Sequence, residues 1–133
     1  MKTDKTTTIS DLKLEVKKFI KERGWDRFQT LRALAISLSL ESNEFLDHFQ
    51  WLNDKEVEEL EKDVTKHEEL AEELCDILSY LLTAADKLNV DLTKVFLNKL
   101  EKNRKKYPIE TFHEGNTWEE DNKKYQDRRK AFE

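Results

Sequence analysis

Glycine, proline and cysteine are almost absent from this chain of 133 residues, which contains two glycines, one proline and one cysteine. Gly-rich phosphate loops of the Rossmann and Walker types need several glycines in one short segment, so both are excluded. The scarcity of turn-forming residues also argues against β-sandwiches and barrels, whereas helices need neither glycine nor proline. The single cysteine, Cys75, cannot form an internal disulfide, which fits a reducing cytoplasm.

The chain also lacks an excess of positive charge and a long apolar run. It contains 24 Lys and Arg against 29 Asp and Glu, so its formal net charge is −5. Proteins that bind nucleic-acid duplexes normally have a basic balance, so we expect no nucleic-acid partner. No apolar run is long enough for a membrane helix, and the N-terminus has no apolar signal segment. We therefore expect a soluble, cytoplasmic protein with no membrane partner.

Helical periodicity dominates what is present. Apolar spacing predicts helices over residues 9–23, 31–52, 64–88 and 91–106, with an acidic connector helix over 54–63 and a loop over 25–30. Residues 109–133 mix charges and aromatic rings without clear periodicity, and the sequence leaves open an arm, a partner contact or partial disorder. The sequence thus predicts an all-α protein, an antiparallel four-helix bundle in one domain over 1–133, with a core of 9–108 and a charged tail of 109–133.

Four acids fall where a helical core is expected. Glu41 and Glu44 are three residues apart beside an apolar face, and Glu73 and Asp76 repeat that spacing on the helix of 64–88. Burying an unpaired carboxylate costs several kcal/mol, so these acids need protons or cations. Oxygen ligands suit Mg²⁺ or Mn²⁺ and not zinc, and Mg²⁺ sites commonly include phosphate oxygens. The alternative is a solvated helix face, since the chain has 29 acids.

The helix expected at 64–88 is apolar over most of its circumference. Two apolar stripes follow its length, and Cys75 belongs to the second of them. This pattern predicts a largely buried helix in which Cys75 is a small core residue. His48, one turn after Glu44, is interpreted as a packed helix histidine, with a metal ligand or a partner of the acids as the alternative.

The acidic pattern resembles a known family. Glu41-x-x-Glu44 followed by Glu73-x-x-Asp76 resembles the E-x-x-E and E-x-x-D signature of the MazG-like, all-α nucleoside triphosphate pyrophosphohydrolases. Two flanking stretches are similar to the dCTP pyrophosphatase branch of that family. One runs from Glu22-Arg-Gly-Trp-Asp-Arg-Phe28 to Phe49-Gln-Trp51, and the other is Lys99 with Asn103-Arg-Lys-Lys-Tyr107-Pro108. The resemblance covers residues 19–108, and it departs at Val16, where the branch has a substrate-contacting histidine.

The resemblance implies an enzyme that hydrolyses a nucleoside triphosphate between its α and β phosphates. It implies Mg²⁺ (with Mn²⁺ possible) bound by Glu41, Glu44, Glu73 and Asp76, and an active site assembled in a homodimer or homotetramer. The positions that match substrate-contacting segments of the family are Trp25, Asp26, Arg27, Phe28 and Gln29, together with Trp51 and Tyr80 around the base. A pyrimidine deoxynucleotide such as dCTP is the substrate that the branch suggests, and the role is the removal of unwanted nucleotides.

Chemistry adds further candidates at this site. A carboxylate with a free oxygen can accept the proton of the attacking water, and Glu44 is our choice for this catalytic role. Lys99 and Arg104, with Asn103 on the same helix, are candidates for the β and γ phosphates. The alternative for these basic residues is a solvated helix end that offsets the helix dipole.

Two other functions remain open at the level of sequence. The first is a non-catalytic helical interaction protein on the same fold, which predicts solvent-exposed acids and no metal binding. The second is a di-metal carboxylate bundle of the ferritin type, which needs Glu-x-x-His on two helices. The present helices offer Glu-x-x-Glu and Glu-x-x-Asp instead, so the ferritin type ranks below the other two functions.

Overall fold

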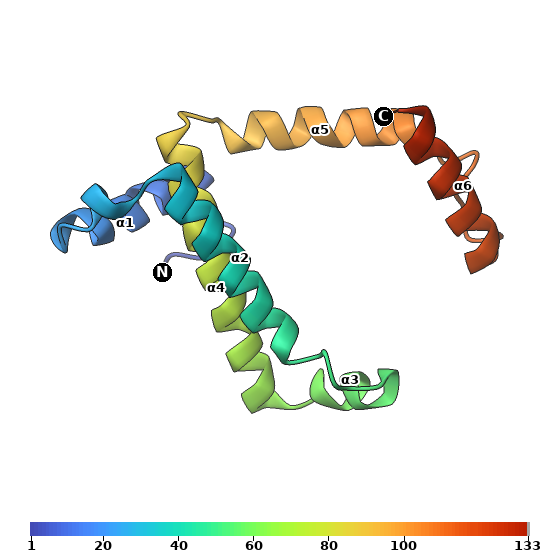
Figure 1. The fold of residues 1–133 in the computed structure, drawn as a ribbon, viewed down its shortest axis with the longest axis horizontal. Helices are drawn as coiled ribbons and strands as arrows, with labels where there is room; N and C mark the ends of the chain where they lie inside the picture. Colours follow the sequence, from blue (N-terminus) through green and yellow to red (C-terminus); the bar gives the residue numbers. More distant parts are fainter. Residues whose placement is uncertain (133) are drawn as a thin grey trace. The chain divides into compact units, whose positions relative to one another are not determined.

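The computed structural model describes residues 1–132, which form helices and turns without any strand (Figure 1). The helices are α1 (Ile9–Glu22), α2 (Leu31–Asp47), α3 (Asp54–Leu60), α4 (Val64–Lys87), α5 (Leu92–Lys106) and α6 (Trp118–Ala131). They divide into two compact units, Met1–Val90 and the chain from Asp91 onward. The predicted all-α class is therefore confirmed, and the single domain over 1–133 stays a prediction. Within residues 1–132, no helix has the length and apolar character needed to cross a membrane.

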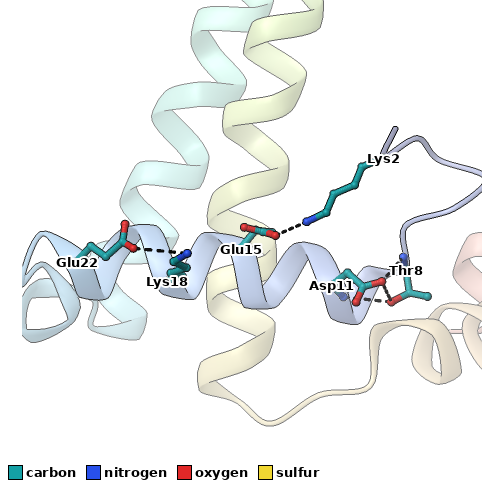
Figure 2. Close-up of polar contacts among 6 residues, drawn as sticks. All are labelled: Lys2, Thr8, Asp11, Glu15, Lys18 and Glu22. Carbon is teal, nitrogen blue, oxygen red and sulfur yellow. Dashed lines mark hydrogen bonds and ion pairs between the residues drawn. The ribbon is translucent and has the colours of Figure 1, made fainter.

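α1 begins at a capping box. The Thr8 hydroxyl accepts a hydrogen bond from the Asp11 N–H, and the Asp11 carboxylate accepts one from the Thr8 N–H at 2.9 Å (Figure 2). These bonds lower the pKa of Asp11 below its ordinary value. Further along α1, Lys2 donates to Glu15, and Lys18 pairs with Glu22 at 3.8 Å. All of these side chains are exposed, so the pairs contribute little to stability.

Gly24 ends α1 and redirects the chain. It adopts a φ of +63°, a left-handed conformation that costs glycine little. The Gly24 N–H donates to the Lys21 carbonyl and the Trp25 N–H to the Ile20 carbonyl, which together form a Schellman motif. Trp25 is thereby turned back against Phe19, with the two rings in edge-on contact and their centroids 5.9 Å apart.

α2 and α4 lie side by side in opposite directions, and α3 joins them at one end (Figure 1). Their contact holds the small core of this unit. Leu34 on α2 is 1% exposed and Leu82 on α4 is 2% exposed, with Ala85 also buried. Burying one such leucine contributes about 1.5–3 kcal/mol. The core therefore joins the start of α2 to the end of α4.

The predicted helix over 31–52 is too long. α2 ends at Asp47, and the N–H groups of Phe49 and Gln50 both donate to the Leu46 carbonyl, so the chain tightens into turns. Asn53 then adopts an extended conformation to cap α3, accepting hydrogen bonds from the N–H groups of Lys55 and Glu56. An extended capping residue cannot continue a helix, which is why α2 stops before it.

α1 crosses α4 near the C-terminal end of α4 (Figure 1). Two lysines of α1 form polar contacts there. Lys17 Nζ lies 2.9 Å from an Asp86 carboxylate oxygen, and Lys13 donates to the Val90 carbonyl. Asn89 adopts a φ of +53° and turns the chain after the end of α4. The next residue is Val90, whose carbonyl accepts the hydrogen bond from Lys13. The position of α1 on α4 thus depends on polar contacts as well as on packing.

The second unit contains a helix that the sequence analysis missed. Residues 118–131 form α6, which begins at a capping box between Thr117 and Glu120. The Tyr107 and Tyr125 rings stack with centroids 5.4 Å apart and planes 13° apart, and Phe112 meets Tyr107 edge-on. The charge-rich face of α6 hides its periodicity, but Thr-x-x-Glu is a helix-start signal that the sequence does contain.

The prediction that the helix at 64–88 is largely buried is wrong for the described chain. Only Leu82 and Ala85 of α4 are buried, while Leu74 and Leu81 are exposed. Cys75, predicted to be a core residue, is exposed as well. The physical reason is that α2 and α1 cover only part of the circumference of α4. Within Met1–Val90, an apolar face of α4 is left without a partner.

Candidate active site

Three acids from two helices converge beside the core. Glu41 on α2 and Glu73 and Asp76 on α4 each present one carboxylate oxygen, and the three oxygens lie within 4.8 Å of one another. Glu41 and Glu73 are half-buried, and Asp76 is exposed. The antiparallel pairing of α2 and α4 brings these separate segments together. We call Glu41, Glu73 and Asp76 the acidic cluster.

Like charges meet at this cluster with little to balance them. Partial burial raises the pKa of Glu41 above its ordinary value, and the charges of Glu44, Asp76 and Glu73 raise it further. Glu44 is exposed and contributes its charge from one turn along α2, although its oxygen lies outside the group of three. The site therefore favours either a proton on Glu41 or a cation beside it.

The donor set of the acidic cluster fits a hard divalent cation. All three donors are carboxylate oxygens, which Mg²⁺ and Mn²⁺ prefer, and the group contains no cysteine or histidine of the kind zinc prefers. A cation among the three oxygens would offset the repulsion that raises the pKa of Glu41. The residues present therefore fit an Mg²⁺ or Mn²⁺ ion, with coordination positions left for water or a ligand.

A cavity of about 570 Å³ adjoins the cluster between α1 and α4. Asp76 belongs to both the cluster and the cavity wall, so a molecule in the cavity lies next to the acids. Trp25, Gln29 and Tyr80, all predicted to contact substrate, line the same cavity, as does Val16. The fold thus gathers one member of the acidic cluster and three predicted substrate residues around one space.

Asp26, Arg27 and Phe28, the other residues of the segment predicted to contact substrate, do not line this cavity. Residues Asp26–Phe28 form a short 3-10 turn in place of the expected loop. Asp26 lines a second, smaller cavity of about 320 Å³ that Gln29 also borders. The Arg27 guanidinium lies over the Phe28 ring, 4.6 Å from its centroid, and neither of these two lines the larger cavity.

The four remaining predicted substrate residues are divided between the two units, one in the first and three in the second. Trp51 sits in the turn after α2 and is 86% exposed. Lys99, Asn103 and Arg104 lie on α5 in the second unit, where Arg104 pairs with Glu101 at 3.2 Å. The substrate roles of these four residues stay predictions.

Other residues of the cavity wall were not predicted from the sequence. Ser79 and Thr83 lie on α4 one and two turns after Asp76, and their hydroxyls donate to the Cys75 and Ser79 carbonyls. Each hydroxyl oxygen keeps acceptor capacity for a ligand. Ser79 is three residues after Asp76 and Thr83 is seven after it, so both lie on its face of the helix, and this spacing is the signal that could have identified them.

Comparisons with known proteins identify relatives of this chain. The model of the MazG-like family matches residues 36–121, which include the whole acidic cluster. dCTP pyrophosphatase 1 from Rattus norvegicus is 33% identical over 102 residues, or 77% of this chain, and that from Homo sapiens is 35% identical over 101 residues. The chain spans about 60% of the length of these relatives. A crystal structure of a pyrophosphatase from Archaeoglobus fulgidus matches with a TM-score of 0.67 and 35% identity, covering 75% of this chain and 92% of that one.

Proposed function

Because this chain belongs to the MazG-like family, we propose that it hydrolyses a nucleoside triphosphate to the monophosphate and pyrophosphate. The observation that carries the proposal is the acidic cluster of Glu41, Glu73 and Asp76 at the edge of a nucleoside-sized cavity. The relatives that share a third of its sequence are named dCTP pyrophosphatase 1. We therefore propose a pyrimidine deoxynucleotide such as dCTP as the substrate, and the clearance of unwanted nucleotides as the role.

The cavity supplies groups suited to a base and a sugar. Trp25 offers a flat ring for stacking, which contributes about 1–3 kcal/mol per base. The amide of Gln29 and the hydroxyl of Tyr80 can hydrogen-bond to a base edge or to a sugar hydroxyl. Trp51, exposed after α2, is proposed to close over the base. For Lys99, Asn103 and Arg104 we propose phosphate binding on side-chain chemistry alone.

The reaction is a displacement at the α-phosphorus. The oxygen of a water forms a bond to that phosphorus while the bond to the α–β bridging oxygen breaks, and pyrophosphate leaves with the electron pair. We assign the proton of the water to a carboxylate oxygen of Glu44. Glu44 suits this role because it is exposed and lies outside the three converging oxygens.

Glu41, Glu73 and Asp76 are the residues that would hold Mg²⁺, and Glu44 would complete the set that the family resemblance implies. When bound, this ion neutralises phosphate charge and makes a nearby water more nucleophilic. The carboxylates orient the phosphates by fixing where that positive charge lies. Mn²⁺ has similar ligand preferences and is a suitable probe.

We also propose that two or more copies associate through the uncovered faces of α2 and α4 to complete a helical bundle. Leu74 and Leu81 on α4 and Leu88 directly after it are exposed and seven residues apart, and Ile36 and Leu40 are exposed on α2. Such contiguous apolar faces mark association sites in soluble proteins. Light scattering after gel filtration should show a dimer or tetramer, and Leu81→Lys should shift the protein toward monomer.

We also propose a cytoplasmic location, because a chain with a single cysteine fits a reducing compartment.

Turnover of a panel of eight NTPs and dNTPs with Mg²⁺ tests the activity. Pyrophosphate must be measured separately from free phosphate, because cleavage at the γ position releases only the latter. Pyrophosphate and monophosphate from one nucleotide or a few would support the proposal and identify the base. Inactivity of folded protein toward the whole panel, with no binding of Mn²⁺, would favour a non-catalytic interaction protein instead.

A further inference from the structure

His48 and Glu73 meet across the two paired helices. His48 directly follows α2, and Glu73 lies in the first half of α4. Nε2 of His48 lies 3.8 Å from Oε1 of Glu73, which is within ion-pair distance but longer than a hydrogen bond. The side chains are 20% and 22% exposed, so both are held in a half-buried position between the helices.

This pair singles out one member of the acidic cluster. Within residues 1–132, neither Glu41 nor Asp76 forms an ion pair, whereas Glu73 has His48 beside it. The pKa of Glu41 is raised by partial burial and, further, by the negative charges of Glu44, Asp76 and Glu73. An imidazole therefore neighbours Glu73, whereas the other two carboxylates of the cluster lack such a partner.

The imidazole also lies beside one of two aromatic rings that pack on each other. Its ring meets Phe49 edge-on with centroids 6.5 Å apart, and Phe49 packs against Phe45 at 5.2 Å. A carboxylate has two oxygens, so one can face Nε2 while the other faces a cation. Residues that orient ligating carboxylates in this way alter metal affinity about 10- to 100-fold when they are removed.

We propose that His48 is a positioning residue that orients the Glu73 carboxylate for a divalent cation without ligating the cation. This inference rests on the metal site of the proposed function. It assigns to His48 a contribution to metal affinity through Glu73, beyond the packing of the helix end.

Titration of the full-length protein with Mn²⁺, followed by calorimetry, tests the proposal. His48→Ala should weaken Mn²⁺ binding about tenfold, and His48→Gln, which retains an N–H donor, should restore affinity to within about threefold of the original protein. The matched control is His67→Ala, since His67 is an exposed histidine in the first turn of α4. It should leave Mn²⁺ affinity unchanged.

Pulsed electron paramagnetic resonance of the Mn²⁺ complex separates positioning from ligation. The proposal expects no nitrogen coordinated directly to Mn²⁺, and a directly bound imidazole nitrogen would overturn it. Equal affinities of the original protein and His48→Ala would overturn it too, as would equal losses in His48→Ala and His48→Gln. If the original protein binds no Mn²⁺ at all, the metal site of the proposed function fails, which is a different result from either.

Discussion

Glu41 on α2 and Asp76 on α4 place carboxylate oxygens within 4.8 Å of each other, although they belong to different helices. Asp76 also forms part of the wall of the adjoining cavity. This pair therefore connects the acidic cluster to the space proposed for the nucleotide. Changes at either residue should affect metal and substrate in ways that can be distinguished.

Asp76→Asn should lower turnover at least about 100-fold and weaken Mn²⁺ binding, because it removes a charge that both the ion and the water depend on. Calorimetry and a pyrophosphate assay measure the two effects. Glu72→Gln is the matched control, since Glu72 is exposed on the same helix and lies outside the acidic cluster. Similar mild effects from both variants would contradict the proposed site.

Trp51→Ala should raise KM about 5- to 150-fold and leave kcat within a few-fold, since base stacking contributes about 1–3 kcal/mol. Steady-state kinetics on the preferred nucleotide measure this separation. Trp118→Ala removes another exposed tryptophan, at the start of α6, and should leave KM unchanged. A loss of kcat with constant KM in Trp51→Ala would exclude a role in binding the base.

Glu41→Gln should stabilise the metal-free protein at neutral pH. The folded-state pKa of Glu41 lies above its unfolded value, so the folded state holds the proton more tightly and loses stability as the pH rises from about 4 through the folded pKa. Glutamine mimics the protonated form and should raise Tm by about 2–4 °C at pH 7. Thermal melts of both proteins across pH 4–8 measure this difference in Tm.

Added Mg²⁺ should make the original protein more stable than Glu41→Gln. It should raise Tm of the original protein increasingly as its concentration exceeds the Kd of the site, because a ligand that binds only the folded state stabilises it. Glu41→Gln, lacking one charged ligand, should gain less from the same addition. A Tm in Glu41→Gln equal to or below that of the original metal-free protein at pH 7 would contradict the repulsion inferred at the acidic cluster.

Leu82→Ala should cost about 2–5 kcal/mol of unfolding free energy, since Leu82 is almost fully buried where α4 meets α2. Urea denaturation measures the loss. Leu14→Ala, at an exposed position of α1, provides the comparison and should cost less than about 1 kcal/mol. Equal losses would mean that this small core does not support the pairing of α2 with α4.

Local signals in the sequence were sufficient for most helix boundaries. Thr8 and Asp11 marked the start of α1, Gly24 marked its end, and Asp91 marked the start of α5. The end of α2 was missed because it depends on the capping of the next helix by Asn53. α6 was missed because its apolar face is weak, although its capping box at Thr117 was readable.

The sequence alone determined the all-helical class and the two acidic pairs, because capping and periodicity act within a few residues along the chain. Tertiary structure decided which acids converge: Glu41, Glu73 and Asp76 gather when α2 and α4 pair, while Glu44 lies outside their group. Tertiary structure also left Cys75 exposed to solvent and brought His48 next to Glu73. The physical reason is that helical spacing defines a face, whereas burial and charge contacts depend on what another segment brings to that face.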